Sequence, residues 1–261
     1  IKSFEEALNI TREIGDKRGE GNHLGNIGTV YIDLGQLEES LKYLQQSIEI
    51  AREIGNKRNE GINLGNLGDI FLRLNRLKEA NTHLVQAIEH CDEIFPVAGG
   101  AFRGSLAFVY ARQGNLEEAE VALEVGESLV AVYPSEYGKF LCNKAKVYHL
   151  AEQPKEAEKA IEHAKAIATE LNATEDSELG KAITETKAFI SEEPTSQKPS
   201  LPKEAETKRL SLDEKEELRV KADELLEKGN IEEAEAFYDE GLEYYEQALS
   251  VYQRIGELRG V

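Results

Sequence analysis

The strongest constraint on this chain is a stretch of sequence that returns forty residues later. GNHLGNIGTVYIDLGQLEESL at residues 21–41 is followed by GINLGNLGDIFLRLNRLKEAN at residues 61–81. The glycines, one asparagine and most large apolar positions coincide when the two segments are aligned. An internal period of about 20 to 50 residues is typical of a solenoid, in which each unit packs mainly on its neighbours. The repeat therefore predicts the architecture before any other feature is considered.

Each unit has the pattern of two packed helices. A first face recurs at the three- and four-residue steps of a helix, through Leu24, Ile27, Gly28 and Tyr31. Gly35 interrupts the pattern, because glycine readily ends a helix in the left-handed conformation. A second face follows with Ser40, Leu44 and Ser47. The small residues on both faces predict an antiparallel hairpin whose helices approach closely. Four such units are expected, beginning near residues 21, 60, 100 and 138.

This pattern resembles the tetratricopeptide repeat (TPR), whose first helix reads large-x-x-large-small-x-x-aromatic and whose second carries small, large and small residues. Further copies are Leu64, Leu67, Gly68 and Phe71 with Ala80, Leu84 and Ala87; Leu106, Ala107 and Tyr110 with Ala119, Leu123 and Gly126; and Leu141, Ala145 and Tyr148 with Ala157, Ile161 and Ala164. The third unit departs from the pattern at Arg103. The resemblance covers residues 1–170 and, less closely, residues 211–256. It implies an all-α fold, a right-handed α-solenoid of antiparallel helix hairpins.

The repeat period of forty residues is longer than that of an ordinary TPR. The extra residues lengthen the second helix of each unit by about a turn and a half. Together with the motifs LGNIG and LGNLG, this period resembles the kinesin-light-chain and Pins-like subgroup. We expect a TPR array at residues 1–190, consisting of half a repeat, about four repeats and an extra helix at 175–191 without a clear partner. A flexible linker rich in Pro, Ser and charge is expected at 191–208, and a further TPR-like hairpin at 209–261.

Composition and charge argue against several classes of partner and indicate a cellular compartment. The net charge of −19 argues against nucleic acid, whose phosphates need a basic surface, and against anionic membranes. No apolar run is long enough for a transmembrane helix, and no signal peptide is recognisable. Two cysteines without metal-ligand spacing indicate thiols in a reducing, cytoplasmic compartment. The absence of methionine suggests a segment excised from a longer chain.

The resemblance also implies where ligands bind. First helices line the concave side in this family, and the residues not used for packing would form a peptide-binding groove: Asn22, Asn26, Thr29, Asn66, Asp69, Arg73, Ser105, Arg112, Lys139, Asn143 and Lys146. Asn26, Asn66 and Asn143 occupy the same place in their units. In the subgroup that asparagine commonly holds an extended peptide backbone, although it could instead bridge neighbouring helices. Gly25, Gly65 and Gly104 would leave a shallow floor for the peptide or permit tight packing between repeats.

Neither catalysis nor metal binding is expected from this sequence. His90 and Cys91 have no further ligands for zinc, and Cys142 and His149 lie about 10 Å apart along one helix. We therefore predict no catalysis, no metal and no cofactor. The leading interpretation is a scaffold that binds a peptide or helix of a partner protein. Alternatives are a sensor array of a bacterial signalling protein, similar to Rap-type regulators, or an accessory region of an enzyme whose catalytic domain is absent.

The C-terminal residues suggest two further interactions. From residue 192 onward the chain has 19 acidic and 10 basic residues. That acidic excess could cover the basic groove residues and regulate access to them. Alternatively, residues 211–256 could begin another block of repeats, or the chain could self-associate through this C-terminal hairpin or through exposed repeat ends.

Overall fold

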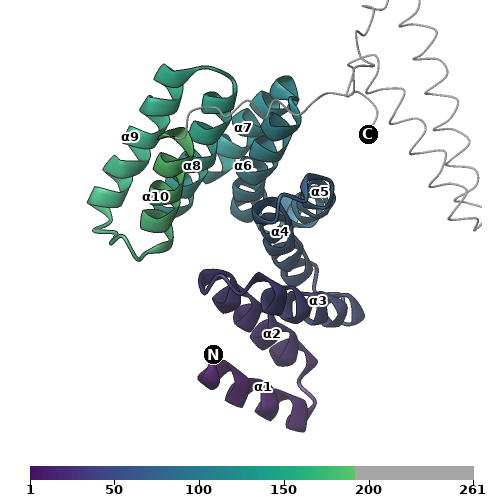
Figure 1. The fold of residues 1–261 in the computed structure, drawn as a ribbon. Coiled ribbons are helices and arrows are strands. Elements are labelled where there is room, and N and C mark those ends of the chain that lie inside the picture. Colours follow the sequence, from purple (N-terminus) through teal and green to yellow (C-terminus); the bar gives the residue numbers. More distant parts are fainter. Residues whose placement is uncertain (192–261) are drawn as a thin grey trace, which may run out of the picture. The chain divides into compact units, whose positions relative to one another are not determined.

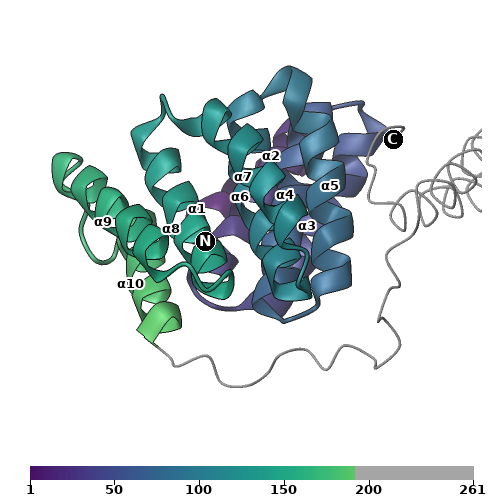
Figure 2. The same ribbon diagram turned by 90° about the horizontal axis from the view of Figure 1, so that it is seen from above.

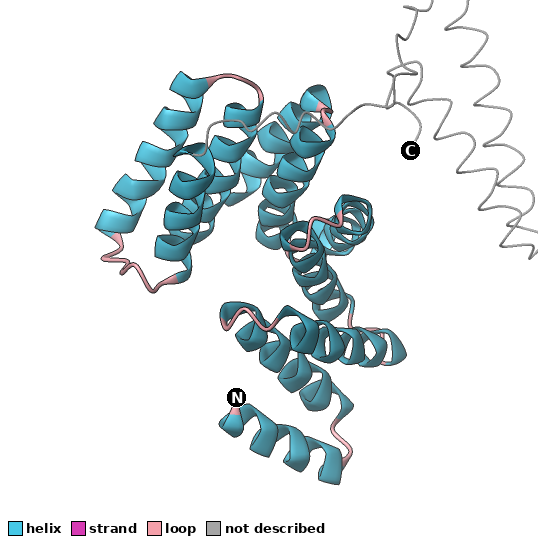
Figure 3. Cartoon of the chain, in the orientation of Figure 1, coloured by secondary structure: helices cyan, strands magenta, loops and turns pink. Residues whose placement is uncertain are grey.

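The computed structural model describes residues 1–191, and the predicted linker and second hairpin lie outside these described residues. Ten helices make up the described part, which contains no strand (Figures 1 and 3). They are α1 (Lys2–Ile14), α2 (Lys17–Asp33), α3 (Leu37–Glu53), α4 (Lys57–Arg73), α5 (Leu77–Ile94), α6 (Pro96–Gln113), α7 (Leu116–Val130), α8 (Pro134–Leu150), α9 (Pro154–Glu170) and α10 (Glu178–Ser191). The predicted all-α solenoid of helix hairpins is confirmed.

Four hairpins follow the single helix α1: α2 with α3, α4 with α5, α6 with α7, and α8 with α9. We call the first member of each pair an A helix and the second a B helix. The A helices begin three or four residues earlier than predicted, because their caps lie upstream of the repeated glycine. Asp16 and Asn56 cap α2 and α4 by accepting hydrogen bonds from the backbone N–H groups of Gly19 and Asn59. Pro96 and Pro134 begin α6 and α8, where proline is favoured.

Within each hairpin, small residues bring the two helices together as predicted. A Cβ atom on Gly28 would lie 2.7 Å from the Leu44 side chain, which is too close for an ordinary contact. Gly68 and Leu84 repeat this relationship in the next hairpin, at 2.5 Å. Ser40 also donates a hydrogen bond of 2.7 Å from Oγ to the carbonyl oxygen of Gly28. The serine hydroxyl therefore stabilises the close approach that the missing side chain allows.

The contacts between hairpins curve the array. Successive A helices contact one another, from α2 to α4, α6 and α8, whereas in the described residues successive B helices do not. An array whose A helices are closer together than its B helices is concave on the A side and convex on the B side. Figure 1 shows the B helices α3 and α5 to the right of their A helices α2 and α4. No helix of the described part is long and apolar enough to cross a membrane.

The prediction that residues 175–191 have no clear partner is wrong. Helix α10 packs on both α8 and α9 (Figure 2). Its Leu179 and Ile183 are buried in one apolar cluster with Leu141 of α8 and Ile167 of α9. A helix that buries its own apolar face while covering the last hairpin removes exposed apolar surface from both, which explains why it folds back there.

Candidate binding groove

The predicted groove residues differ in how much of each side chain solvent can reach. Asn22, Asn26, Thr29 and Arg73 are exposed; Asn66, Asp69, Arg112, Lys139, Asn143 and Lys146 are half-buried; Ser105 is buried. All lie on A helices. Ser105 is therefore not a groove-lining residue, contrary to the prediction. The amide of Asn143, on the next A helix, lies 3.4 Å from its hydroxyl oxygen and covers it.

The recurring asparagines connect neighbouring A helices. Nδ2 of Asn66 lies 3.5 Å from Oγ1 of Thr29, and Nδ2 of Asn143 donates across 3.4 Å to Oγ of Ser105. Both distances exceed the usual range for N–H···O bonds, so these contacts are weak. Each uses one of the two N–H donors of an amide that also carries an acceptor oxygen. An asparagine at this place can consequently bridge two helices and still bond a ligand.

A carboxylate lies among cations at the centre of the A-helix surface. Burial raises the pKa of Asp69, while a hydrogen bond from Ser105 and the charges of Arg73, Lys146 and Lys139 act in the opposite direction. The three cations come from two different A helices, α4 and α8. Glu136 and Glu178 pair with Lys139, and Glu185 acts on Lys146, so cations and carboxylates alternate in this part of the A-helix surface.

The buried ring of Phe108 on α6 lies near two cations, Lys146 and, in addition to those above, Arg112. Nζ of Lys146 lies 5.4 Å from the ring centroid, and the guanidinium carbon of Arg112 lies 5.8 Å from it. Burial lowers the pKa of both cations, and for Lys146 the nearby Glu185 opposes this effect. Arg112 also donates a 2.8 Å hydrogen bond to Oδ1 of Asn75. These contacts hold two positive groups beside an apolar ring.

Helix α10 covers the end of the groove formed by α8. Nζ of Lys139 lies 2.8 Å from a carboxylate oxygen of Glu178 on α10 and 2.9 Å from one of Glu136. Burial lowers the pKa of Lys139, but these two carboxylates outweigh that effect and raise it. At the other end of α10, Phe189 contacts Phe108. Residues of α10 therefore already contact the predicted ligand group Lys139 and the ring of Phe108.

Sequence reasoning missed this contribution of α10, although a signal was present. Glu178, Glu185 and Phe189 are spaced by seven and four residues, which places them along one side of a helix. Cations at similar spacing occur in α8, at Lys139 and Lys146. The complementary pattern could have indicated that these two helices pair.

The proposed glycine floor is not present. A Cβ atom on Gly104 would lie 2.8 Å from the ring of Phe140, on the next A helix. Gly25 faces Asn63 in the same way at 2.9 Å, and Gly65 lies directly against the ring of Phe102. Each glycine is therefore covered by the following A helix rather than open to a ligand. The alternative interpretation, tight packing between repeats, is the one that holds.

Neither cysteine of the described residues is an activated thiol. Cys142 and Cys91 are buried free thiols, and burial raises the pKa of each to about 11, which keeps them protonated and weakly nucleophilic at neutral pH. In residues 1–191 no group of three or more His, Cys, Asp or Glu side chains is placed to hold a metal ion. What the surface of the A helices does provide is hydrogen-bonding amides and cations along adjacent helices.

Comparison with known proteins identifies the repeat. A family model described as a tetratricopeptide repeat matches residues 19–93, and another of the same description matches residues 100–124. These two stretches, covering most of α2 to α7, are therefore similar to tetratricopeptide repeats. No curated protein matches the chain.

Solved structures extend the similarity at the level of the fold. The crystal structure of BtubC (BKLC) from P. vanneervenii superposes with a TM-score of 0.53 and 18% sequence identity, over 66% of this chain and 72% of that one. The apo form of RapI matches with a TM-score of 0.48 and 13% identity, over 97% of this chain and 83% of that one. At 18% identity, the similarity to BtubC shows a shared fold and nothing further.

Proposed function

We propose that the concave face of the A helices binds an extended peptide from a partner protein. Tetratricopeptide repeats generally mediate protein–protein interaction, and the matched stretches include the A helices α2, α4 and α6. The observation that carries the proposal is the recurrence of Asn26, Asn66 and Asn143 at one place in three A helices. Asn26 is exposed, and the other two are held only by long contacts.

The spacing of the A helices suits an extended chain. Packed helices lie about 8–10 Å apart, and an extended peptide advances about 3.3 Å per residue. Asn26 and Asn66, on successive A helices, would thus meet the peptide about three residues apart, and Asn143, two A helices beyond Asn66, about six residues farther along it. Each amide can donate to a peptide carbonyl and accept from a peptide N–H. This mode of binding recognises the main chain and tolerates different sequences.

The distribution of charged residues along the A helices indicates which residues the proposed peptide carries and in which direction it runs. The surface of α2 offers the uncharged Asn22, Asn26 and Thr29, whereas α4, α6 and α8 offer Arg73, Arg112 and Lys146. A peptide with an acidic residue over α6 and polar or small residues over α2 complements this arrangement. We also propose that the chain belongs to the kinesin-light-chain and Pins-like subgroup, which the forty-residue repeat period supports. The two free thiols support a cytoplasmic location.

A selection experiment tests the proposal. A random peptide display library would be panned against the full chain, and the affinity of selected peptides measured for the parent and for Asn66→Ala. We expect the variant to bind more weakly by roughly 1–3 kcal/mol, because it loses hydrogen bonds to the peptide backbone. Asn9→Ala is the matched control, because Asn9 is exposed on α1. Peptides that bind all three proteins equally would show that the groove is not the binding site.

A further inference from the structure

The outer face of α7 differs from the outer faces of the other B helices. Val121 and Val125 lie one helical turn apart with 56% and 42% of their surface exposed, and Val132 and Tyr133 follow in the turn after the helix, 78% and 50% exposed. We call these four residues the valine patch. Burying two or more apolar side chains that stand in solvent is favourable, so such a patch is a candidate contact surface.

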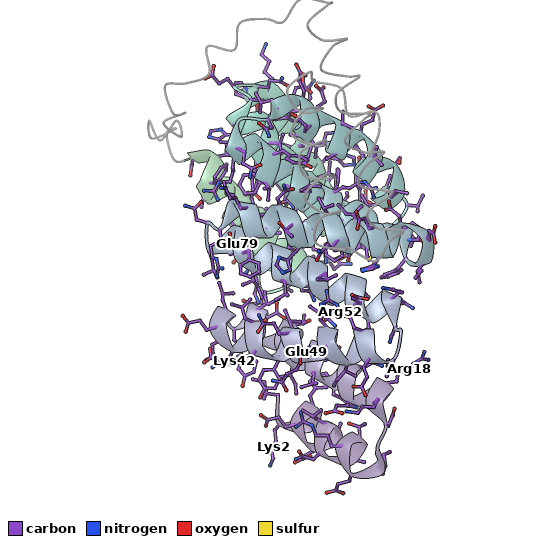
Figure 4. The ribbon with its side chains drawn as sticks, turned by 90° about the vertical axis from the view of Figure 1, so that its right-hand side faces the viewer. Lys2, Arg18, Lys42, Glu49, Arg52 and Glu79 are labelled. Atoms are coloured by element: carbon purple, nitrogen blue, oxygen red, sulfur yellow. The ribbon has the colours of Figure 1, made fainter. Side chains whose placement is uncertain are left out.

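The repeats themselves provide the comparison. The equivalent positions in the other three B helices are all polar. The residues equivalent to Val121 are Lys42, Thr82 and Lys159, and those equivalent to Val125 are Gln46, Gln86 and His163. The residues equivalent to Val132 are Glu53, Glu93 and Glu170. All nine of these side chains are exposed. Figure 4 shows Lys42, together with Glu49, on the outer face of α3. The array thus uses polar residues at these places and replaces them by valine in one repeat.

The surroundings of the valine patch are acidic. Helix α7 contains five glutamates and neither lysine nor arginine. Glu117 and Glu124 lie four and three residues from Val121, which places them directly beside it on the helix surface, and both are exposed. Glu120 is also exposed. An occupant of the patch must therefore bring apolar side chains and positive charge together.

We propose that the valine patch docks an amphipathic helix of a partner protein, whose apolar stripe is flanked by lysine or arginine. The ridge formed by Val121 and Val125 at i and i+4 fits the groove between side chains of a second helix. The flanking glutamates favour a basic helix and disfavour acidic occupants. This site lies on the convex side of the array and does not depend on the peptide groove.

The acidic residues around the valine patch favour a basic helix over three other possible occupants. A second copy of the chain, packed through the same patch, would set Glu117 and Glu124 against their own counterparts. Residues 192–261 of the chain contain 19 acidic and 10 basic residues and would be repelled for the same reason. Anionic lipid headgroups are repelled as well. A basic helix alone among these gains from both the valines and the glutamates.

A pair of designed peptides tests the proposal on the full chain. Both are helical and carry leucine at i, i+4, i+7 and i+11; one has lysine beside the stripe and its twin has glutamate. Fluorescence anisotropy would measure their binding to the parent and to the double variant Val121→Lys with Val125→Gln, which copies the first repeat. We expect the lysine peptide to bind the parent at least about tenfold more tightly than the double variant, a factor that corresponds to burial of roughly one valine side chain.

Two further variants make the result specific. Glu117→Lys with Glu124→Lys should reverse the preference, so that the glutamate peptide binds better. Thr82→Lys with Gln86→Lys, on the outer face of α5, should leave lysine-peptide binding unchanged. Equal binding of both peptides to the parent, no binding of either, or no effect of the valine substitutions would overturn the proposal. A dimer that dissociates in the valine variant would assign the patch to self-association instead. Asn66→Ala should not alter this binding, which separates it from the groove.

Discussion

The ring of Phe189 in α10 stands edge-on to the ring of Phe108 in α6, with centroids 5.3 Å apart and planes at 89°. Phe189 also makes a T-shaped contact with His149 of α8, at 5.7 Å. One side chain thus joins α10 to two successive A helices. The contact explains how a helix that covers the last hairpin also reaches Phe108, the buried ring that lies near Arg112 and Lys146.

The first prediction concerns the energy of this pair. Edge-to-face aromatic pairs contribute about 0.5–1.5 kcal/mol beyond the area that they bury. A double-mutant cycle with Phe108→Leu and Phe189→Leu should show coupling of that size in the free energy of unfolding, measured with urea. Phe108→Leu combined with Phe4→Leu, in the distant helix α1, should be additive. Additivity in both cycles would mean that α10 does not hold its position on α6 in solution.

The helix hairpins and their internal packing could be predicted because they depend on local patterns. Gly28 and Leu44 belong to one hairpin, and their spacing fixes which residues meet. The contact between Gly65 and Phe102 was not predictable in this way, because a mid-helix glycine looks the same whether it faces a ligand or another helix. Whether Gly65 faces a ligand or another helix depends on the ring of Phe102, which the next A helix supplies.

The sequence could predict that the candidate groove residues lie on A helices, but not how accessible each of them is. The register placed Asn66, Lys139 and Lys146 on A helices, and the structure has them there. How much of each is free depends on α10, whose glutamates lie near the lysines. That contact joins residues 39 positions apart, Lys139 and Glu178, and no local pattern reports it.

The second prediction follows from the packing of Gly65. A methyl group at this position would overlap the ring of Phe102, which is 8% exposed and belongs to the core. Gly65→Ala should lower stability by about 1–3 kcal/mol, as overpacking usually does. Replacing Phe102 by leucine in the same chain should recover part of the loss. Thermal unfolding at the parent's midpoint for Gly65→Ala would contradict the packing described here.

The third prediction concerns the core of the second hairpin. Leu67 is 3% exposed and lies in one cluster with Leu84 and Phe71. Leu67→Ala should cost about 2–5 kcal/mol, because it removes apolar contacts and leaves a cavity. Since each repeat packs mainly on its neighbours, hydrogen exchange should increase first in α4 and α5. Leu34→Ala, at a leucine that is 58% exposed, is the control and should change little.

A fourth prediction addresses the acidic residues after 191, whose structure lies outside the described part. If they cover Arg73 and Arg112, a groove-binding peptide should bind the chain ending at Ser191 more tightly than the full chain at low salt. The difference should fade at high salt, because exposed charges are then screened. Equal affinities at low salt would exclude such a role. The glutamates of α10 are present in both chains and so cannot account for a difference.

The fifth prediction uses an ion cluster between the first two hairpins. Oε1 of Glu60 lies 2.7 Å from Nε of Arg52 and 3.5 Å from Nε2 of His90, and Oε2 lies 3.2 Å from Nζ of Lys57. The Glu60 side chain is only 4% exposed. Burial raises the pKa of Glu60, but hydrogen bonds from Arg52 and Lys57 and the His90 ring outweigh burial and bring the pKa below its ordinary value.

A carboxylate with a lowered pKa stabilises the folded state above its ordinary pKa of 4.5, and that stabilisation is lost as the pH falls through the folded value. Glu60→Gln should therefore unfold more easily at pH 7, by about 1–3 kcal/mol, because Arg52 loses a charged partner. The gap between parent and variant should narrow as urea unfolding is repeated below pH 4.5. Glu6→Gln removes the exposed pair with Lys2 and should leave the profile unchanged. If the Glu60→Gln profile runs parallel to the parent's from pH 7 to pH 3, the cluster is not the source of the acid sensitivity, and the stabilisation of this junction must come from apolar packing alone.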